Sequence, residues 1–201
     1  MEKVLLIDNS KTWTRMIEDR AESELNMECE KAHSLKEAQA LLEEDDYFVA
    51  VSGLVLEDAP DGEIIDFLHE RRLPTIVLTS GFGSFDKTSL FDKSVIDYNL
   101  KSDSGDVGHI VDSIRRIHHN RQMRVLLLET DEAITAQIRP RMEKMLLEVV
   151  VIEDIHEAFA AIEEDGRMKL VISTYSEGDD RALQFLKIIR SQYPKERVGY
   201  L

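Results

Sequence analysis

The sequence has few of the residues that cross-link a chain or interrupt its regular structure: one cysteine, four prolines and nine glycines among 201 residues. The single cysteine, Cys29, excludes an intrachain disulfide and fits a reducing compartment, so we expect a cytoplasmic protein. No apolar run approaches the roughly 18 residues that a membrane span needs, and no basic segment precedes an apolar one at the N-terminus. We therefore expect neither a secreted nor a membrane-spanning chain.

Basic residues are also scarce. There are 25 Lys and Arg against 40 Asp and Glu, which gives a formal net charge of -15. Such a charge repels the phosphates of nucleic acids and anionic membrane surfaces. The hydrophobic content of 43% is nevertheless ordinary for a globular chain that buries one or two modest cores. The composition therefore predicts a globular protein that binds neither nucleic acid nor membranes.

The chain contains an internal repeat. The segment Val4–Asp8 is echoed by Val125–Glu129, at an offset of 121 residues. The segment Glu37–Ala40 is matched by Glu157–Ala160 at nearly the same offset. Two copies of one unit explain the length better than one large domain, and the second copy is then incomplete. We expect a first domain at residues 1–120, a connector at 121–124 and a second, truncated domain at 125–201, in a fragment of a longer protein.

Short apolar runs alternate with helical patterns in both copies. In the first copy, for example, Val4–Ile7 reads as a strand, and Ser34 with Glu37 reads as the capping box that begins a helix. Continuous apolar strands separated by helices indicate a parallel sheet that helices cover on both faces. The pattern predicts an α/β fold with a doubly wound sheet, of five strands and five helices in the first unit. The second unit lacks a fifth strand and two helices.

In open sheets of this kind, functional residues gather at the carboxyl ends of the strands. In the first unit these ends carry Asp8, Asn9, Ser52, Gly53, Thr79, Ser80 and Lys101. In the second unit Glu129 and Thr130 follow the first strand, and Thr174 stands 121 residues after Gly53. A carboxylate, a hydroxyl and an ammonium group at one sheet edge are the groups that phosphoryl transfer uses.

This ordered set resembles the receiver domain of bacterial response regulators, a flavodoxin-like (βα)5 fold. The resemblance implies that an acidic pair after the first strand holds Mg²⁺ and that an Asp after the third strand accepts a phosphoryl group. On that basis Asp8 is the first acid and a candidate Mg²⁺ ligand, and Asn9 stands in place of the second acid. Thr79 and Lys101 supply the hydroxyl and the ammonium group. Tyr98 is the aromatic residue of the fifth strand, on an expected signalling surface.

Both copies depart from the receiver pattern at the acceptor. Gly53 occupies that position in the first unit and has no nucleophile. Thr174 occupies it in the second unit, where the acidic pair becomes Glu129 and Thr130. Both units therefore resemble degenerate receivers, and no other cofactor is indicated. The tandem arrangement is similar to the N-terminal double-receiver part of some bacterial diguanylate cyclases.

The first hypothesis is a non-enzymatic regulatory module of a two-component phosphorelay. It would act through contacts with a histidine kinase, an output domain or another effector, with a homodimer as a further option. An alternative is a receiver that takes phosphate on Asp58, Asp61 or Thr174, a small hydrolase of similar fold, or the input region of a larger diguanylate cyclase. A third hypothesis is that the vacated pocket binds a small anion near Lys101.

Overall fold

The computed structural model describes residues 2–81, 93–101, 105–174, 180–194 and 198–200. The chain forms two compact units, Met1–Ile117 and His118–Leu201. Helix α5 (Gly105–Arg121) extends past the end expected for the first domain, so only Gln122 and Met123 separate it from strand β6 (Arg124–Leu128). No described helix is both long and apolar enough to cross a bilayer.

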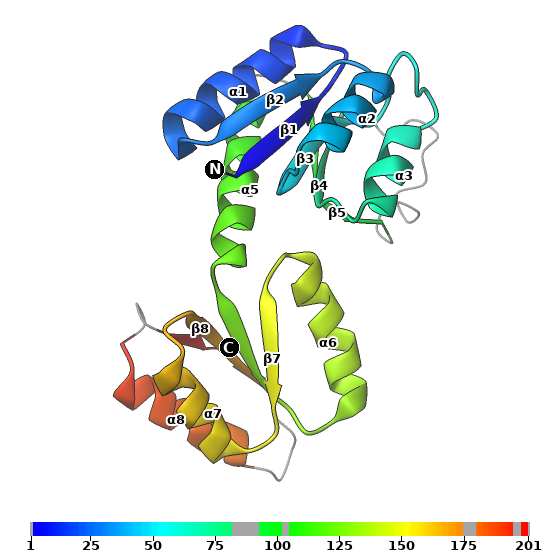
Figure 1. The fold of residues 1–201 in the computed structure, drawn as a ribbon. Coiled ribbons are helices and arrows are strands. Elements are labelled where there is room, and N and C mark those ends of the chain that lie inside the picture. Colours follow the sequence, from blue (N-terminus) through cyan, green and yellow to red (C-terminus); the bar gives the residue numbers. More distant parts are fainter. Residues whose placement is uncertain (1, 82–92, 102–104, 175–179, 195–197, 201) are drawn as a thin grey trace. The chain divides into compact units, whose positions relative to one another are not determined.

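The first unit is a five-stranded parallel sheet with the order β2-β1-β3-β4-β5 (Figure 1). Its strands are β1 (Lys3–Ile7), β2 (Glu28–Ala32), β3 (Val49–Gly53), β4 (Thr75–Thr79) and β5 (Val95–Leu100). Besides α5, its described helices are α1 (Lys11–Leu25), α2 (Leu35–Glu44) and α3 (Glu63–Glu70). The fifth expected helix would fall between Gly81 and Lys93, outside the described residues.

Alternation along the strands sends side chains into a core on each face of this sheet. Leu5 and Ile7 of β1 belong to a buried cluster with residues of α2 and α3, such as Ala38 and Ile64. Val4 and Leu6 are fully buried as well, and α1 and α5 lie on the other face (Figure 1). Cys29 of β2 is buried, as expected of a small apolar residue in this strand, and burial raises the pKa of its thiol to about 12.

The second unit repeats the plan with a shorter, four-stranded parallel sheet, ordered β7-β6-β8-β9. Besides β6, its elements are α6 (Glu132–Lys144), β7 (Glu148–Ile152), α7 (Ile155–Glu164), β8 (Met168–Ser173), α8 (Arg181–Gln192) and β9 (Gly199–Tyr200). Helices α7 and α8 cover one face, where the rings of Phe159 and Phe185 meet edge to face at 5.0 Å. The predicted fold, doubly wound parallel sheets with the second one shorter, is confirmed.

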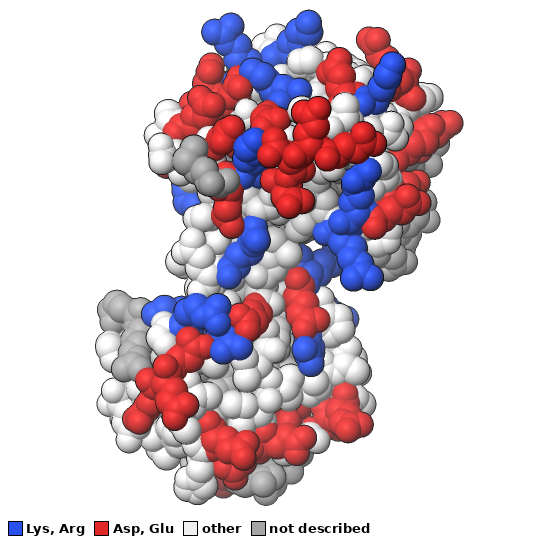
Figure 2. Space-filling view, in the orientation of Figure 1, with Lys and Arg blue, Asp and Glu red and all other residues white. Residues whose placement is uncertain are grey.

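The strand register places the two units in correspondence. Ile7 of β1 pairs with Ser52 of β3, so the next residues, Asp8 and Gly53, lie side by side at the carboxyl ends of these strands. Leu128 of β6 pairs with Ser173 of β8 in the same way, which brings Glu129 beside Thr174. Acidic side chains appear on both units in Figure 2, as the composition requires.

Candidate functional site

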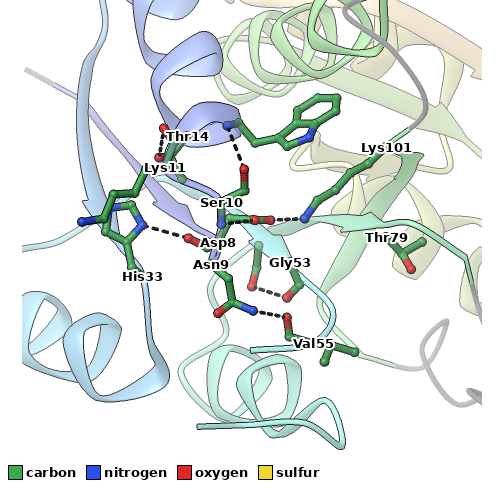
Figure 3. Close-up of polar contacts among 12 residues, drawn as sticks. Asp8, Asn9, Ser10, Lys11, Thr14, His33, Gly53, Val55, Thr79 and Lys101 are labelled. Carbon is green, nitrogen blue, oxygen red and sulfur yellow. Dashed lines mark hydrogen bonds and ion pairs between the residues drawn. The ribbon is translucent and has the colours of Figure 1, made fainter. Parts of the chain in front are cut away.

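The site of the first unit lies at the carboxyl edge of its sheet, where β1 passes into α1 (Figure 3). Asp8 directly follows β1, and its Oδ1 atom accepts a hydrogen bond from the Ser10 backbone N–H at 2.9 Å. Ser10 is the N-cap of α1, and its hydroxyl accepts a hydrogen bond from the Trp13 N–H at 3.4 Å. These two bonds fix the turn, so the Asp8 carboxylate is held in place by the start of the helix.

The second oxygen of Asp8 binds Lys101. The Lys101 ammonium donates to Asp8 Oδ2 from 93 residues away in the sequence. The Lys101 backbone N–H donates to the Thr79 carbonyl at 2.8 Å, which fixes the lysine at the end of β5. The Asp8 side chain is 4% exposed and that of Lys101 16%, so water screens this ion pair little. The structure thus brings together the carboxylate and the ammonium group that the sequence singled out.

Gly53 makes room for this ion pair. A Cβ atom at position 53 would lie 2.9 Å from Asp8 Oδ2, too close for an unshifted side chain. Thr79 lies at the end of the neighbouring strand, and its hydroxyl donates to the Gly81 carbonyl and accepts from the Gly81 N–H. A cavity of about 240 Å³ adjoins the pair, lined by Leu54, Val55, Leu78, Thr79, Ser80, Gly81 and Lys101.

Asn9 is turned toward the loop after β3 instead of toward Asp8 (Figure 3). Its amide donates to the Val55 carbonyl at 3.4 Å and accepts from the Glu57 N–H at 3.2 Å. His33, which the sequence reasoning missed, contacts the Asp8 carbonyl through Nδ1 at 2.8 Å. The signal that could have found it is its place just after β2, the neighbour of β1 in the sheet.

Asp58 and Tyr98 have structural contacts near the site: Asp58 caps a helix, and Tyr98 packs against the core. Both carboxylate oxygens of Asp58 accept backbone N–H groups at the start of α2, from Leu35 at 2.8 Å and Lys36 at 3.1 Å. These hydrogen bonds lower the pKa of Asp58. Tyr98 of β5 is half-buried against the core that α2 and α3 share, and burial raises its pKa to about 12. Asp61 is exposed in the loop before α3.

The second unit has a corresponding but different arrangement. Glu129 is 7% exposed, and its Oε1 atom accepts the N–H groups of Thr130 and Asp131, each at 2.9 Å. Its Oε2 atom accepts the hydroxyl of Thr174. The Glu129 side chain therefore contacts Thr174 at the end of the neighbouring strand β8. The predicted residues therefore meet, with Thr130 contributing its backbone.

The residues of the first site do not fit Mg²⁺. This ion prefers six oxygen ligands in octahedral geometry and usually binds one or two carboxylates. Both Asp8 oxygens already accept hydrogen bonds, Asn9 is engaged by the loop, and Gly53 offers no side chain. Within the described ranges, no group of three or more His, Cys, Asp or Glu side chains could hold a metal ion.

No protein-family model matches the chain, and no curated protein does either. Two solved structures match it over 100% of its length. One, a "putative two-component system response regulator/ggdef domain protein", has a TM-score of 0.87 and 25% sequence identity, and the match covers 81% of that chain. The other, a "probable two-component system response regulator/GGDEF domain protein", has a TM-score of 0.85 and 26% identity, again over 81% of that chain.

A shorter match agrees with the fold of a single unit. A two-component response regulator from Clostridium difficile has a TM-score of 0.50 and 17% identity, over 58% of this chain and 97% of that chain. At this identity the likeness concerns the fold alone. Together with the two full-length matches and the repeated register of the two sheets, it identifies the chain as two tandem receiver-like domains, the second of them shorter.

Proposed function

We propose that the chain is a signalling module of a two-component response regulator that acts through protein contacts and has lost the phosphoacceptor in both units. The observation that carries the proposal is the pair of neighbouring strand ends at Asp8 and Gly53, where the acceptor position has no side chain. Gly53 ends the third strand beside Asp8, and the lysine that would neutralise a phosphorylated carboxylate binds Asp8 instead. The chain is then not an enzyme by itself.

The full-length matches suggest where such a module works. Both matched proteins carry a GGDEF domain in their descriptions, so we place this module beside a GGDEF output domain, as the input region of a cytoplasmic diguanylate cyclase. Its partners would be that output domain and a kinase or effector that contacts the receiver surfaces. A chain with two units of one fold is suited to such contacts, since each unit presents its own surface.

The alternative acceptors are less suitable for transfer. Both oxygens of Asp58 accept backbone N–H groups at the start of α2, so phosphorylation would break this helix cap. Thr174 does have a base within reach, because its hydroxyl donates to Glu129. That carboxylate, however, would also repel an incoming phosphate. An anion at Lys101 would have to compete with the Asp8 carboxylate for the same ammonium group.

The test is phosphorylation by a small-molecule donor. The chain is incubated with Mg²⁺ and acetyl phosphate, and its intact mass is measured; a receiver with an intact acceptor verifies the reagent. We expect no adduct on the parent chain. We expect one on Gly53→Asp, which supplies a carboxylate at the acceptor position, and none on Gly53→Asn, which has the same shape without the nucleophile.

A phosphate adduct on the parent chain would overturn the proposal. Its stability would then identify the acceptor class, because acyl phosphates hydrolyse readily in acid or base and a threonine phosphate survives acid. Peptide mapping would follow on Asp58→Asn, Asp61→Asn and Thr174→Val. Each variant removes one candidate nucleophile and leaves the side-chain volume nearly unchanged.

A further inference from the structure

Both oxygens of the Asp8 carboxylate are engaged by the chain itself. Oδ1 accepts the Ser10 N–H, and Oδ2 accepts the Lys101 ammonium. The His33 ring approaches the carbonyl of the same residue. A divalent ion at this carboxylate would have to displace the ammonium group and then lie close to it, since β5 holds Lys101 at the site through its backbone bond to Thr79. Two cations cannot share one buried carboxylate at low cost.

The absence of a side chain at position 53 is part of the same arrangement. With an Asp there, two carboxylates would face one lysine, and the local charge would be negative enough to attract a metal ion. With Gly53, one carboxylate faces one ammonium group, and the charges balance. The close approach of Asp8 Oδ2 to the Gly53 backbone requires that no Cβ atom be present.

We infer that the Lys101 ammonium is the resident cation of the first unit's pocket and takes the place of Mg²⁺, so that this unit keeps one state whether or not Mg²⁺ is present. The inference rests on the proposed function, because it takes Gly53 as the vacated acceptor position. In this site a cation that is covalently part of the chain stands where a dissociable metal ion would bind. A removable ion can signal by binding and leaving, whereas Lys101 cannot leave.

The test is a Mg²⁺ titration of the parent chain, Lys101→Met and Lys101→Arg. Trp13 is the one tryptophan of the sequence and lies in the first turn of α1, three residues after Ser10, so its fluorescence reports on the site. We expect millimolar MgCl2 to change neither the fluorescence nor the melting temperature of the parent chain. Lys101→Met leaves Asp8 without its cation, so Mg²⁺ at about tenfold its Kd should raise the melting temperature by about 3 °C or more. Lys101→Arg restores a cation and should not respond.

The outcomes separate this inference from the proposed function. Saturable Mg²⁺ binding by the parent chain at the Asp8 site, abolished in Asp8→Asn, would overturn the inference while the acceptor could still be missing. A folded Lys101→Met that ignores Mg²⁺ would overturn it too. If Lys101→Met does not fold even with Mg²⁺, the test passes to Gly53→Asp and Gly53→Asn. A rise in melting temperature with Mg²⁺ for the Asp variant alone supports the inference that the balance of one carboxylate and one ammonium group excludes the metal ion. An equal response of both variants contradicts the inference.

Discussion

At the scale of single residues, the close contact between Gly53 and Asp8 decides what the first pocket can hold. Gly53 ends strand β3 and is not among the described residues with positive φ, so its backbone does not demand glycine. The demand comes from Asp8, whose Oδ2 atom would lie 2.9 Å from a Cβ atom there. Asp8 cannot easily move away, because it is buried and held by Ser10 and Lys101.

We expect Gly53→Ala to lower the free energy of unfolding of the first unit by about 1–3 kcal/mol, the usual cost of an overpacked site. In a strand, Ala would otherwise be no worse than Gly, so the sign isolates the steric contact. Urea denaturation measures the change. Gly81→Ala is the control, since no described heavy atom lies within 4 Å of its added Cβ. Equal stability of Gly53→Ala and the parent would show that Asp8 yields freely.

At the scale of helices, the start of α2 is capped from two places in the chain. Ser34 is the N-cap, and its hydroxyl accepts the Glu37 N–H at 3.1 Å, as the predicted capping box requires. In a capping box the Glu37 carboxylate would accept the backbone N–H of Ser34 itself, and here it does not. It accepts the N–H of His33 at 2.7 Å, one residue before the N-cap. The loop after β3 supplies the second cap, Asp58, so the strand-end loop and α2 are tied together.

Asp58 should make stability depend on pH. Its pKa is lowered in the folded chain by the N–H groups of Leu35 and Lys36, so its contribution is present above the unfolded pKa of roughly 4 and is lost as pH falls through the lower folded pKa. We expect Asp58→Asn to melt at a lower temperature than the parent at pH 7 and the difference to shrink toward pH 3. Melting curves across this range measure it. Asp61→Asn should show no such convergence, and a pH-independent gap for Asp58→Asn would contradict the capping role.

The two units also share an ion pair between the start of a strand and the end of a helix. The first strand of each unit, β1 or β6, begins with a cation that binds the C-cap residue of that unit's second helix. Lys3 binds Asp45 at 2.9 Å and Glu30 at 2.6 Å, and Arg124 binds Asp165 at 2.7 Å. Asp45 and Asp165 end α2 and α7. The two units therefore have the same kind of ion pair at the amino ends of their strands. At the carboxyl ends they differ, because Asp8 binds the Lys101 ammonium group and Glu129 accepts the Thr174 hydroxyl.

At the scale of the whole molecule, the alternation of apolar runs with helical patterns predicts the fold, and the repeat offset predicts which strand-end positions correspond in the two units. Short apolar runs rich in Val, Ile and Leu, separated by helical patterns, indicate buried parallel strands. Equivalent residues in two copies of one unit occupy equivalent registers, as Asp8 with Gly53 and Glu129 with Thr174 do. The side-chain partners could not be predicted in this way. Lys101 lies 93 residues from Asp8, and nothing in the local sequence states which carboxylate its flexible side chain binds.

In the second unit, too, the partner of a site side chain lies far away in the sequence. The residues next to Thr174 in the sequence, Ser173 and Tyr175, supply no carboxylate or imidazole that could act as its base. The base that its hydroxyl contacts is Glu129, 45 residues away at the end of the adjacent strand. The register of the repeat contained this information, since Glu129 stands where Asp8 stands. The sequence pattern thus predicts where the backbone places each residue, whereas the partner of each side chain is seen only in the folded structure.

The two separate cores lead to a last prediction, about unfolding. Phe185 and Leu68 are each fully buried, in the clusters of the second and first unit respectively. Truncating either to Ala removes core contacts and leaves a cavity, which costs about 3–5 kcal/mol for Phe185→Ala and about 2–5 kcal/mol for Leu68→Ala. Because each unit has its own core, calorimetry should show that Phe185→Ala lowers one transition and Leu68→Ala the other. A single transition that both variants shift together would mean that the two units unfold as one cooperative body.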